Sequence, residues 1–222
     1  WMNLLVVVAQ MGFGTGSLRY VAQYRAQDEP GLLRGFLSTS QWLPLAASLV
    51  VSIGLVGITV VARSHMSVGV FRCLLLASLL VPIVASIRLR EAGLLGFSRV
   101  ISGQLSSVLL PALVMGLIWL TPRLSGTALS SHQVVLMHIG SAVVTLTVLS
   151  LLFRRVLEPK IHGTTAELRV GEWLSVTSPL LLVQLLTLMQ DQSGTLMCGL
   201  LSGSEAAGTF AAAARVAAVL FL

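Results

Sequence analysis

The fold is decided by two stretches of sequence, QWLPLAASLVVSIGLVGITVVA at residues 41–62 and VGVFRCLLLASLLVPIVASI at residues 68–87. Each is long enough to cross the hydrocarbon of a bilayer as an α-helix, which takes about 20 residues. Neither alternates apolar with polar residues as a strand would, and both are too long for the strands of a membrane barrel. The two stretches therefore predict a pair of membrane-spanning helices joined by a short turn.

Further apolar stretches of this kind lie at 1–18, 100–120, 133–153 and 174–201, and another begins near residue 206. Apolar residues make up 55% of the chain and charged residues only 10%. A soluble domain has about a quarter of its residues charged. We therefore predict an all-α, polytopic transmembrane helix bundle with about seven spans. Because both ends lie inside apolar stretches, we expect the chain to be a piece of a longer protein.

The basic residues predict how the helices are oriented. Ten of them fall in three connecting segments, 19–40, 88–99 and 154–173. They are Arg19, Arg25, Arg34, Arg88, Arg90, Arg99, Arg154, Arg155, Lys160 and Arg169. The alternate loops have only Arg63, with Arg72 nearby, and Arg123. Basic loops of membrane proteins stay in the cytoplasm, so we expect the three segments there, and the net charge of +6 does not indicate binding to nucleic acid.

Few residues point to chemistry. The sequence has no His-Glu-x-x-His or Gly-x-Ser-x-Gly motif and no acidic metal cluster. Gly12 and Gly16 have the spacing of a close helix contact, and a helix irregularity that lines a cavity is the alternative. His138 lies alone within a predicted span, where hydrogen-bonded packing competes with a functional role. Four prolines fall within spans, where kinking and gating are both open: Pro44, Pro82, Pro111 and Pro179.

Charges inside the last two apolar stretches are the strongest functional candidates. Asp191 lies beside Gln190 in the stretch 174–201, and Arg215 lies in the stretch that begins near residue 206. A charge at the middle of the bilayer costs about 2.5–3.5 kcal/mol on insertion scales. Asp191 and Arg215 could pair with each other across consecutive helices, or they could line a hydrophilic cavity that handles a substrate or a coupling ion.

Three stretches resemble a known family: GFGTGSLRYVAQY at 12–24, SPL at 178–180 followed by Gln190 and Asp191, and GSEAAGTFAAAARVA at 203–217. They are similar to polysaccharide and O-antigen flippases of the multidrug/oligosaccharidyl-lipid/polysaccharide exporter superfamily. The third stretch has Thr209-Phe210 where the family has a Gly-Tyr step.

The resemblance implies a transporter of two six-helix lobes around a central cavity, with twelve or more helices. Residues 1–153 would form helices 2–6 of the first lobe, 154–173 a cytoplasmic connector, and 174–222 the start of the second lobe, with helices 7 and 8. Such a protein would be a monomer in the bacterial inner membrane, in contact with membrane lipids. It would have no cofactor beyond a coupling proton or sodium ion.

The expected substrate is a lipid-linked oligosaccharide on polyprenyl pyrophosphate, moved from the inner to the outer leaflet by alternating access. Arg19 and Arg215 occupy matching motif positions and are the first candidates to bind the pyrophosphate. Asp191 and Gln190 are candidates for a partner or for a proton or sodium site.

Two alternatives stay open. A multidrug or cation antiporter of the same fold would favour acidic residues in the first lobe, yet the spans 41–62, 68–87, 100–120 and 133–153 have no Asp or Glu. A polysaccharide polymerase or ligase would need a large outer loop with Arg or His, and the outer loops near 63–67, 121–132 and 202–205 are short. We therefore expect a transporter and not an enzyme.

Overall fold

The computed structural model describes residues 2–125, 130–157 and 164–220, except for the side chains of 124–125, 204, 215–216 and 218–220. The described residues are helical apart from short turns and the stretch before residue 170. The elements in chain order are α1 (Met2–Gln10), α2 (Phe13–Ala26), α3 (Pro30–Val61), the short η1 (Ala62–His65), α4 (Val68–Gly96), α5 (Val100–Ser125), α6 (Ser131–Val156) and α8 (Val170–Leu220). The chain divides into two compact units, Trp1–Leu181 and Leu182–Leu222, and α8 continues from one into the other.

Five helices are long and apolar enough to cross a membrane: Pro30–His65, Val68–Gly96, Val100–Arg123, Ser131–Val156 and Val170–Gly203. A sixth span results if Met2–Gln10 and Phe13–Ala26, which are bent by 40°, cross together. An all-helical, multi-pass architecture is therefore confirmed, but the predicted count of seven spans is not. The stretch from 206 onward is the part of α8 after Gly203, and among the described residues it does not qualify as a span of its own.

The two connecting segments 19–40 and 88–99, predicted to be cytoplasmic, are mostly helical. α2 continues to Ala26, α3 starts at Pro30 and α4 continues to Gly96. α2 and α4 each end in a Schellman turn, with Asp28 (φ 53°) after α2 and Ser98 (φ 60°) after α4 in the left-handed region. In each turn the next backbone N–H, of Glu29 or Arg99, bonds to the carbonyl five residues earlier. These turns, and not the loss of hydropathy, end the helices.

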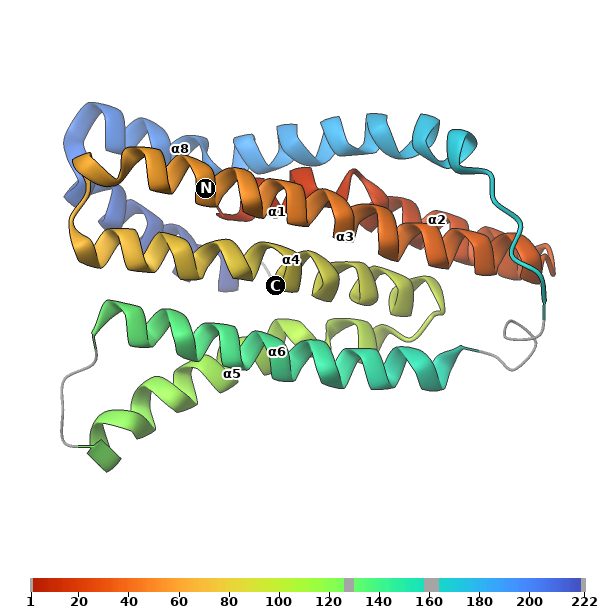
Figure 1. Ribbon diagram of the computed structural model, residues 1–222, viewed down its shortest axis with the longest axis horizontal. Coiled ribbons are helices and arrows are strands. Elements are labelled where there is room, and N and C mark those ends of the chain that lie inside the picture. The colour runs from red at the N-terminus through yellow and green to blue at the C-terminus, as the bar shows by residue number, and fades with distance from the viewer. Residues whose placement is uncertain (1, 126–129, 158–163, 221–222) are drawn as a thin grey trace. The chain divides into compact units, whose positions relative to one another are not determined.

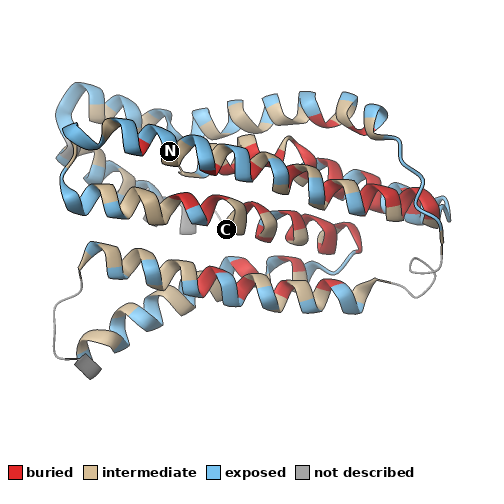
Figure 2. Cartoon of the chain, in the orientation of Figure 1, coloured by how far each residue is buried: buried red, intermediate tan, exposed pale blue. Residues whose placement is uncertain are grey.

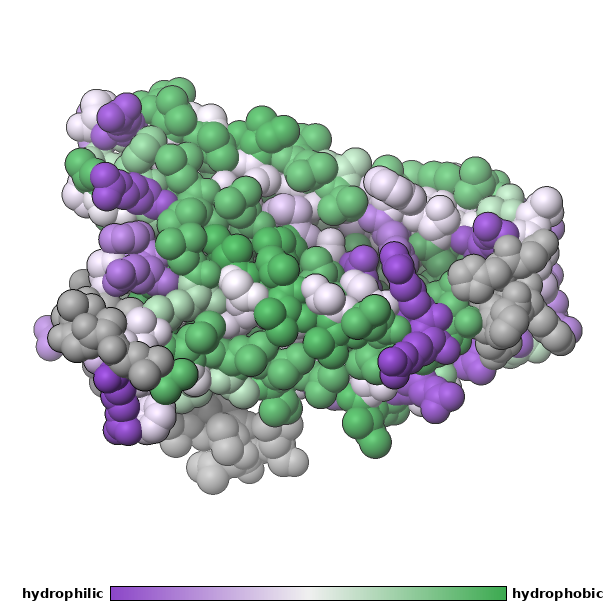
Figure 3. Space-filling model, turned by 60° about the horizontal axis from the view of Figure 1, so that its bottom comes forward, coloured by the Kyte–Doolittle hydropathy of each residue, from purple (hydrophilic) through white to green (hydrophobic). Residues whose placement is uncertain are grey.

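From α2 onward, successive helices of the first unit run in opposite directions, so that α2, α4 and α6 end on the side where α3, α5 and α8 begin (Figure 1). We call this the basic end, because the three basic segments predicted to be cytoplasmic join the helices there; Lys160 lies outside the described residues. A space-filling view shows hydrophobic residues over the middle of the helices and hydrophilic residues towards their ends (Figure 3). This arrangement agrees with helices that cross the hydrocarbon of a bilayer.

Buried residues concentrate towards the basic end of the first unit (Figure 2). Five rings from α2, α3 and α8 form what we call the aromatic junction: Phe13, Tyr20, Tyr24, Phe36 and Trp173. The Phe36 ring lies 5.0 Å from that of Tyr20 and 5.4 Å from that of Trp173. Trp173 is completely buried, and its indole N–H donates to Tyr24 Oη over 2.9 Å. The junction fixes the start of α8 against α2 and α3.

The glycine contact predicted from spacing is present in the aromatic junction. A Cβ on Gly12 would lie 1.9 Å from the Thr177 carbonyl oxygen, and one on Gly16 would lie 2.7 Å from Thr177 Cγ2. Gly12 also has φ 76°, and Met11 before it has φ 51°, so the first apolar stretch is broken here. The close helix contact is therefore confirmed, and the helix is irregular at Gly12, but neither glycine lines a cavity described below.

α4 is the central helix of the first unit and contacts α1, α2, α3, α5 and α6. All four prolines predicted to lie in spans are inside helices. Pro82 has no N–H for the Ser78 carbonyl one turn earlier. The Ser52 hydroxyl of α3 donates to that carbonyl over 2.7 Å. A neighbouring helix therefore satisfies the backbone group that the proline leaves open.

Candidate functional site

The residues predicted to bind substrate belong to both units of the chain. Arg19 is exposed on α2 in the first unit, and Gln190 and Asp191 are exposed on α8 in the second unit. None of these three lines the cavities described below. Arg215 belongs to α8, but its side chain lies outside the described residues. The predicted pairing of Asp191 with Arg215 therefore stays a prediction.

The second unit turns at Gly203, where φ is 86° and ψ is 178°. This lies inside the predicted outer loop 202–205. A Cβ on Gly194 would lie 2.6 Å from the Phe210 ring, and one on Gly199 would lie 3.5 Å from the Ala207 Cβ. Small residues therefore allow the two arms of α8 to pack closely on each other.

A cavity of about 380 Å³ lies in the first unit between α1, α4, α5 and α6. Its polar lining consists of Asn3, Arg88, Glu91, Ser106, Ser107 and His138. Its apolar lining consists of Met2, Val84, Ile87, Leu110 and Pro111. We call it the polar cavity. It is large enough for water or for part of a polar ligand, and its walls come from helices that are otherwise apolar.

The charged pair of the polar cavity is on α4. Arg88 Nη1 and Glu91 Oε2 are 3.3 Å apart, and the two residues are spaced by about one turn of the helix. The Glu91 side chain is 10% exposed and the Arg88 side chain 58% exposed. Burial of a lone carboxylate is costly, and the adjacent guanidinium offsets that cost. The Arg88 head keeps access to the cavity and to solvent, so it can still contact an anion.

The opposite wall comes from α5 and α6. Ser106 is buried, and His138 is half-buried. Pro111 has no N–H for the carbonyl of Ser107 one turn earlier, so that carbonyl lacks its usual helix donor. α5 approaches α4 closely beside the cavity at Gly103. A Cβ on this residue would lie 2.7 Å from the Leu95 side chain and 3.3 Å from the Glu91 carbonyl. His138 and Pro111, whose roles could not be decided from the sequence, therefore line the same cavity.

The sequence missed this site for an identifiable reason. Arg88 was placed in a predicted loop, and Glu91 was not singled out, because α4 was expected to end near residue 87. The spacing of Arg88 and Glu91, three residues apart, was the available signal that the helix continues. Asn3 and His138 join the pair only through the packing of α1 and α6.

The polar cavity can do two things chemically. Its guanidinium can bind an anion such as a phosphate through charge-assisted hydrogen bonds. Its carboxylate and imidazole can accept and release protons, which is a common use of ionisable groups in membrane transporters. Among the described residues, no group of three or more His, Cys, Asp or Glu side chains is placed to hold a metal ion.

No family model, curated protein or solved structure matches the chain.

Proposed function

We propose that the chain forms part of a transporter that moves a lipid-linked oligosaccharide from the inner to the outer leaflet by alternating access. The observation that carries the proposal is the polar cavity, where a guanidinium, a carboxylate and an imidazole meet among apolar helices. Ionisable groups in such a position are costly, and they mark the paths of polar substrates and protons. The likeness of 12–24 and 203–217 to the flippases gives the substrate class.

Arg88 is the residue we assign to the substrate, in addition to Arg19 and Arg215. A pyrophosphate is a dense anion that suits the planar guanidinium. Arg88 begins the segment 88–99 that we expect to face the cytoplasm, on the side where a substrate made on the inner leaflet would enter. Glu91 holds this arginine through the 3.3 Å pair.

The test uses the intact gene in its native bacterium. The gene is deleted, the leaflet on which lipid-linked oligosaccharide accumulates is measured, and variants are tested for rescue. We expect accumulation on the cytoplasmic leaflet and failed rescue by Arg88→Ala, Arg19→Ala and Arg215→Ala. Arg63→Ala is the matched control, because Arg63 is in η1 at the opposite end of the first unit. Normal distribution of the lipid-linked sugar in the deletion strain would contradict the proposal.

A cation or drug antiporter is the second candidate, and one observation now favours it. The sequence argued against it because the predicted spans of the first lobe have no acidic residue. α4 continues to Gly96, and its Glu91 is buried in the polar cavity. Heightened sensitivity of the deletion strain to cationic drugs, not rescued by Glu91→Gln, with normal lipid-linked sugar, would establish the antiporter instead.

A further inference from the structure

A second polar site lies between α3, α4 and α6 and shares no lining residue with the polar cavity. It consists of two adjoining cavities of about 300 Å³ and 230 Å³, which have Gln41 and Trp42 in common. We call it the arginine groove. Its polar and aromatic lining is Arg34, Ser38, Gln41, Trp42, Ser86, Arg90 and Arg154.

The groove gathers three positive charges from three helices. Arg34 Nη1 donates to the Thr164 carbonyl over 2.5 Å, and Arg90 Nη1 donates to the Ser86 carbonyl over 3.2 Å. Arg154 lies close enough to Arg90 for the two positive charges to repel each other. The described lining residues include no acidic side chain. An anion between these arginines would remove the repulsion and gain charge-assisted hydrogen bonds.

An apolar stripe leads away from the groove along α3. Trp42 is 71% exposed, and Val50 and Ile53 are each 70% exposed. These residues, with Leu49, are spaced by 7, 8 and 11 positions from Trp42, so they lie on one face of the helix. The stripe lies within the span Pro30–His65. Tryptophan is the residue that membrane proteins place where hydrocarbon meets head groups.

The three arginines of the groove and the apolar stripe on α3 together suit an amphiphilic ligand. A free phosphate would use only the arginines, whereas a lipid with an anionic head would use the arginines, Trp42 and the stripe. We propose that the arginine groove binds the phosphate head group of an anionic membrane phospholipid, with an acyl chain along Trp42, Val50 and Ile53. Basic pockets between membrane helices on the cytoplasmic side bind such head groups in other proteins. This site does not depend on what the chain transports.

The test is a titration of the purified full chain in a neutral detergent with three probes: dioleoyl phosphatidylglycerol, dioleoyl phosphatidylcholine and inorganic phosphate. We expect saturable binding of phosphatidylglycerol, with a rise in the thermal midpoint, and no such response to the other two. The double variant Arg90→Gln/Arg154→Gln should weaken phosphatidylglycerol binding by about a hundredfold, since each charge-assisted hydrogen bond is worth roughly tenfold or more. The matched control Arg63→Gln/Arg123→Gln changes the same charge away from the groove and should bind as the parent does.

A second measurement needs no arginine variant. Phosphatidylglycerol brominated on its acyl chains should quench Trp42 fluorescence at concentrations where brominated phosphatidylcholine does not. The quenched fraction should fall in Trp42→Phe. Equal quenching by both lipids, equal binding by the control double variant and the groove variant, or a response to inorganic phosphate equal to that of phosphatidylglycerol would each overturn the assignment.

Discussion

The aromatic junction and the polar cavity belong to the same unit, but the junction is closely packed whereas the cavity encloses open volume. In the junction, rings meet at 5.0–6.5 Å and a glycine leaves no room for a methyl group. In the polar cavity, charged and polar side chains surround about 380 Å³ of open volume. Close packing specifies where helices lie, whereas an open polar volume costs stability and persists when it has another use. We therefore expect changes in the junction to affect stability and changes in the cavity to affect function.

The largest loss of stability should come from Gly12→Ala. The new Cβ would lie 1.9 Å from the Thr177 carbonyl oxygen, and residue 12 must keep φ 76°. Backbone strain and overpacking together should lower the free energy of unfolding by about 2–6 kcal/mol. Equilibrium unfolding in mixed detergent micelles measures it.

The control for this change is Gly57→Ala on α3. No atom of the described residues lies within 4 Å of a Cβ at Gly57, and alanine favours a helix over glycine by about 0.5–1 kcal/mol. Gly57→Ala should therefore be neutral or stabilising. If both variants unfold alike, the contact of Gly12 with Thr177 does not hold α2 against α8.

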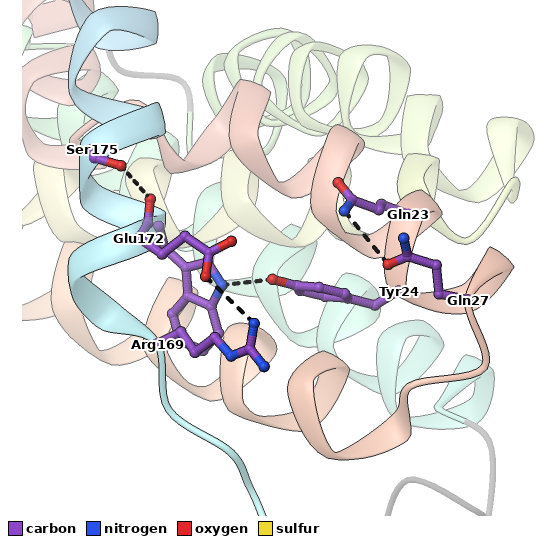
Figure 4. Close-up of polar contacts among 7 residues, drawn as sticks. Gln23, Tyr24, Gln27, Arg169, Glu172 and Ser175 are labelled. Atoms are coloured by element: carbon purple, nitrogen blue, oxygen red, sulfur yellow. Dashed lines mark hydrogen bonds and ion pairs between the residues drawn. The ribbon is translucent and has the colours of Figure 1, made fainter.

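Tyr24→Phe should have the next largest effect. It removes the acceptor that lies 2.9 Å from the Trp173 indole nitrogen and leaves a buried N–H without a partner (Figure 4). A loss of about 1–3 kcal/mol in the free energy of unfolding is expected. Tyr20→Phe is the matched control, because Tyr20 is equally buried and the described residues give its hydroxyl no hydrogen bond. Equal losses in the two variants would mean that the hydrogen bond adds nothing.

Glu91→Gln tests the cavity side of the comparison. Its partner Arg88 keeps access to solvent, so the free energy of unfolding should fall by no more than about 1 kcal/mol. Transport in the rescue assay should nevertheless fall by roughly tenfold or more, because the carboxylate no longer holds the guanidinium. Arg169 and Glu172 form an exposed pair with the same spacing, 3.7 Å apart. Glu172→Gln is therefore the control, and transport reduced equally by both changes would remove the polar cavity from the mechanism.

Much of the fold was predictable because it depends on local properties. Apolar stretches of membrane length predicted the helices of α3 to α6, and the spacing of Gly12 and Gly16 predicted a close contact. Hydropathy did not predict where the helices begin and end, because polar residues extend a helix beyond its apolar stretch. A proline marks the start of one such helix, and a left-handed turn marks the end of another. α3 starts at Pro30, and α4 ends before the turn at Ser98.

The site was less predictable than the fold because its parts are distant in sequence. Asn3, Glu91 and His138 meet only when α1, α4 and α6 pack together. The sequence could find charges within apolar stretches, as it did for Asp191, but it could not tell which of them share a cavity. An arginine just beyond an apolar stretch has the same local pattern whether it is exposed outside the described cavities, as Arg19 is, or lines one of them, as Arg88 does.

The smallest expected effect sharpens the comparison most, because it concerns a polar atom inside the packed junction. The Thr177 hydroxyl is buried and has no hydrogen-bond partner among the described residues, while Thr177 Cγ2 faces Gly16. Thr177→Val keeps that methyl contact and removes a buried polar group that gains nothing. The free energy of unfolding should stay the same or rise by up to about 1 kcal/mol. A loss of more than about 1 kcal/mol would mean that the hydroxyl is hydrogen-bonded in the folded protein, and the junction would then depend on polar contacts as the cavity does.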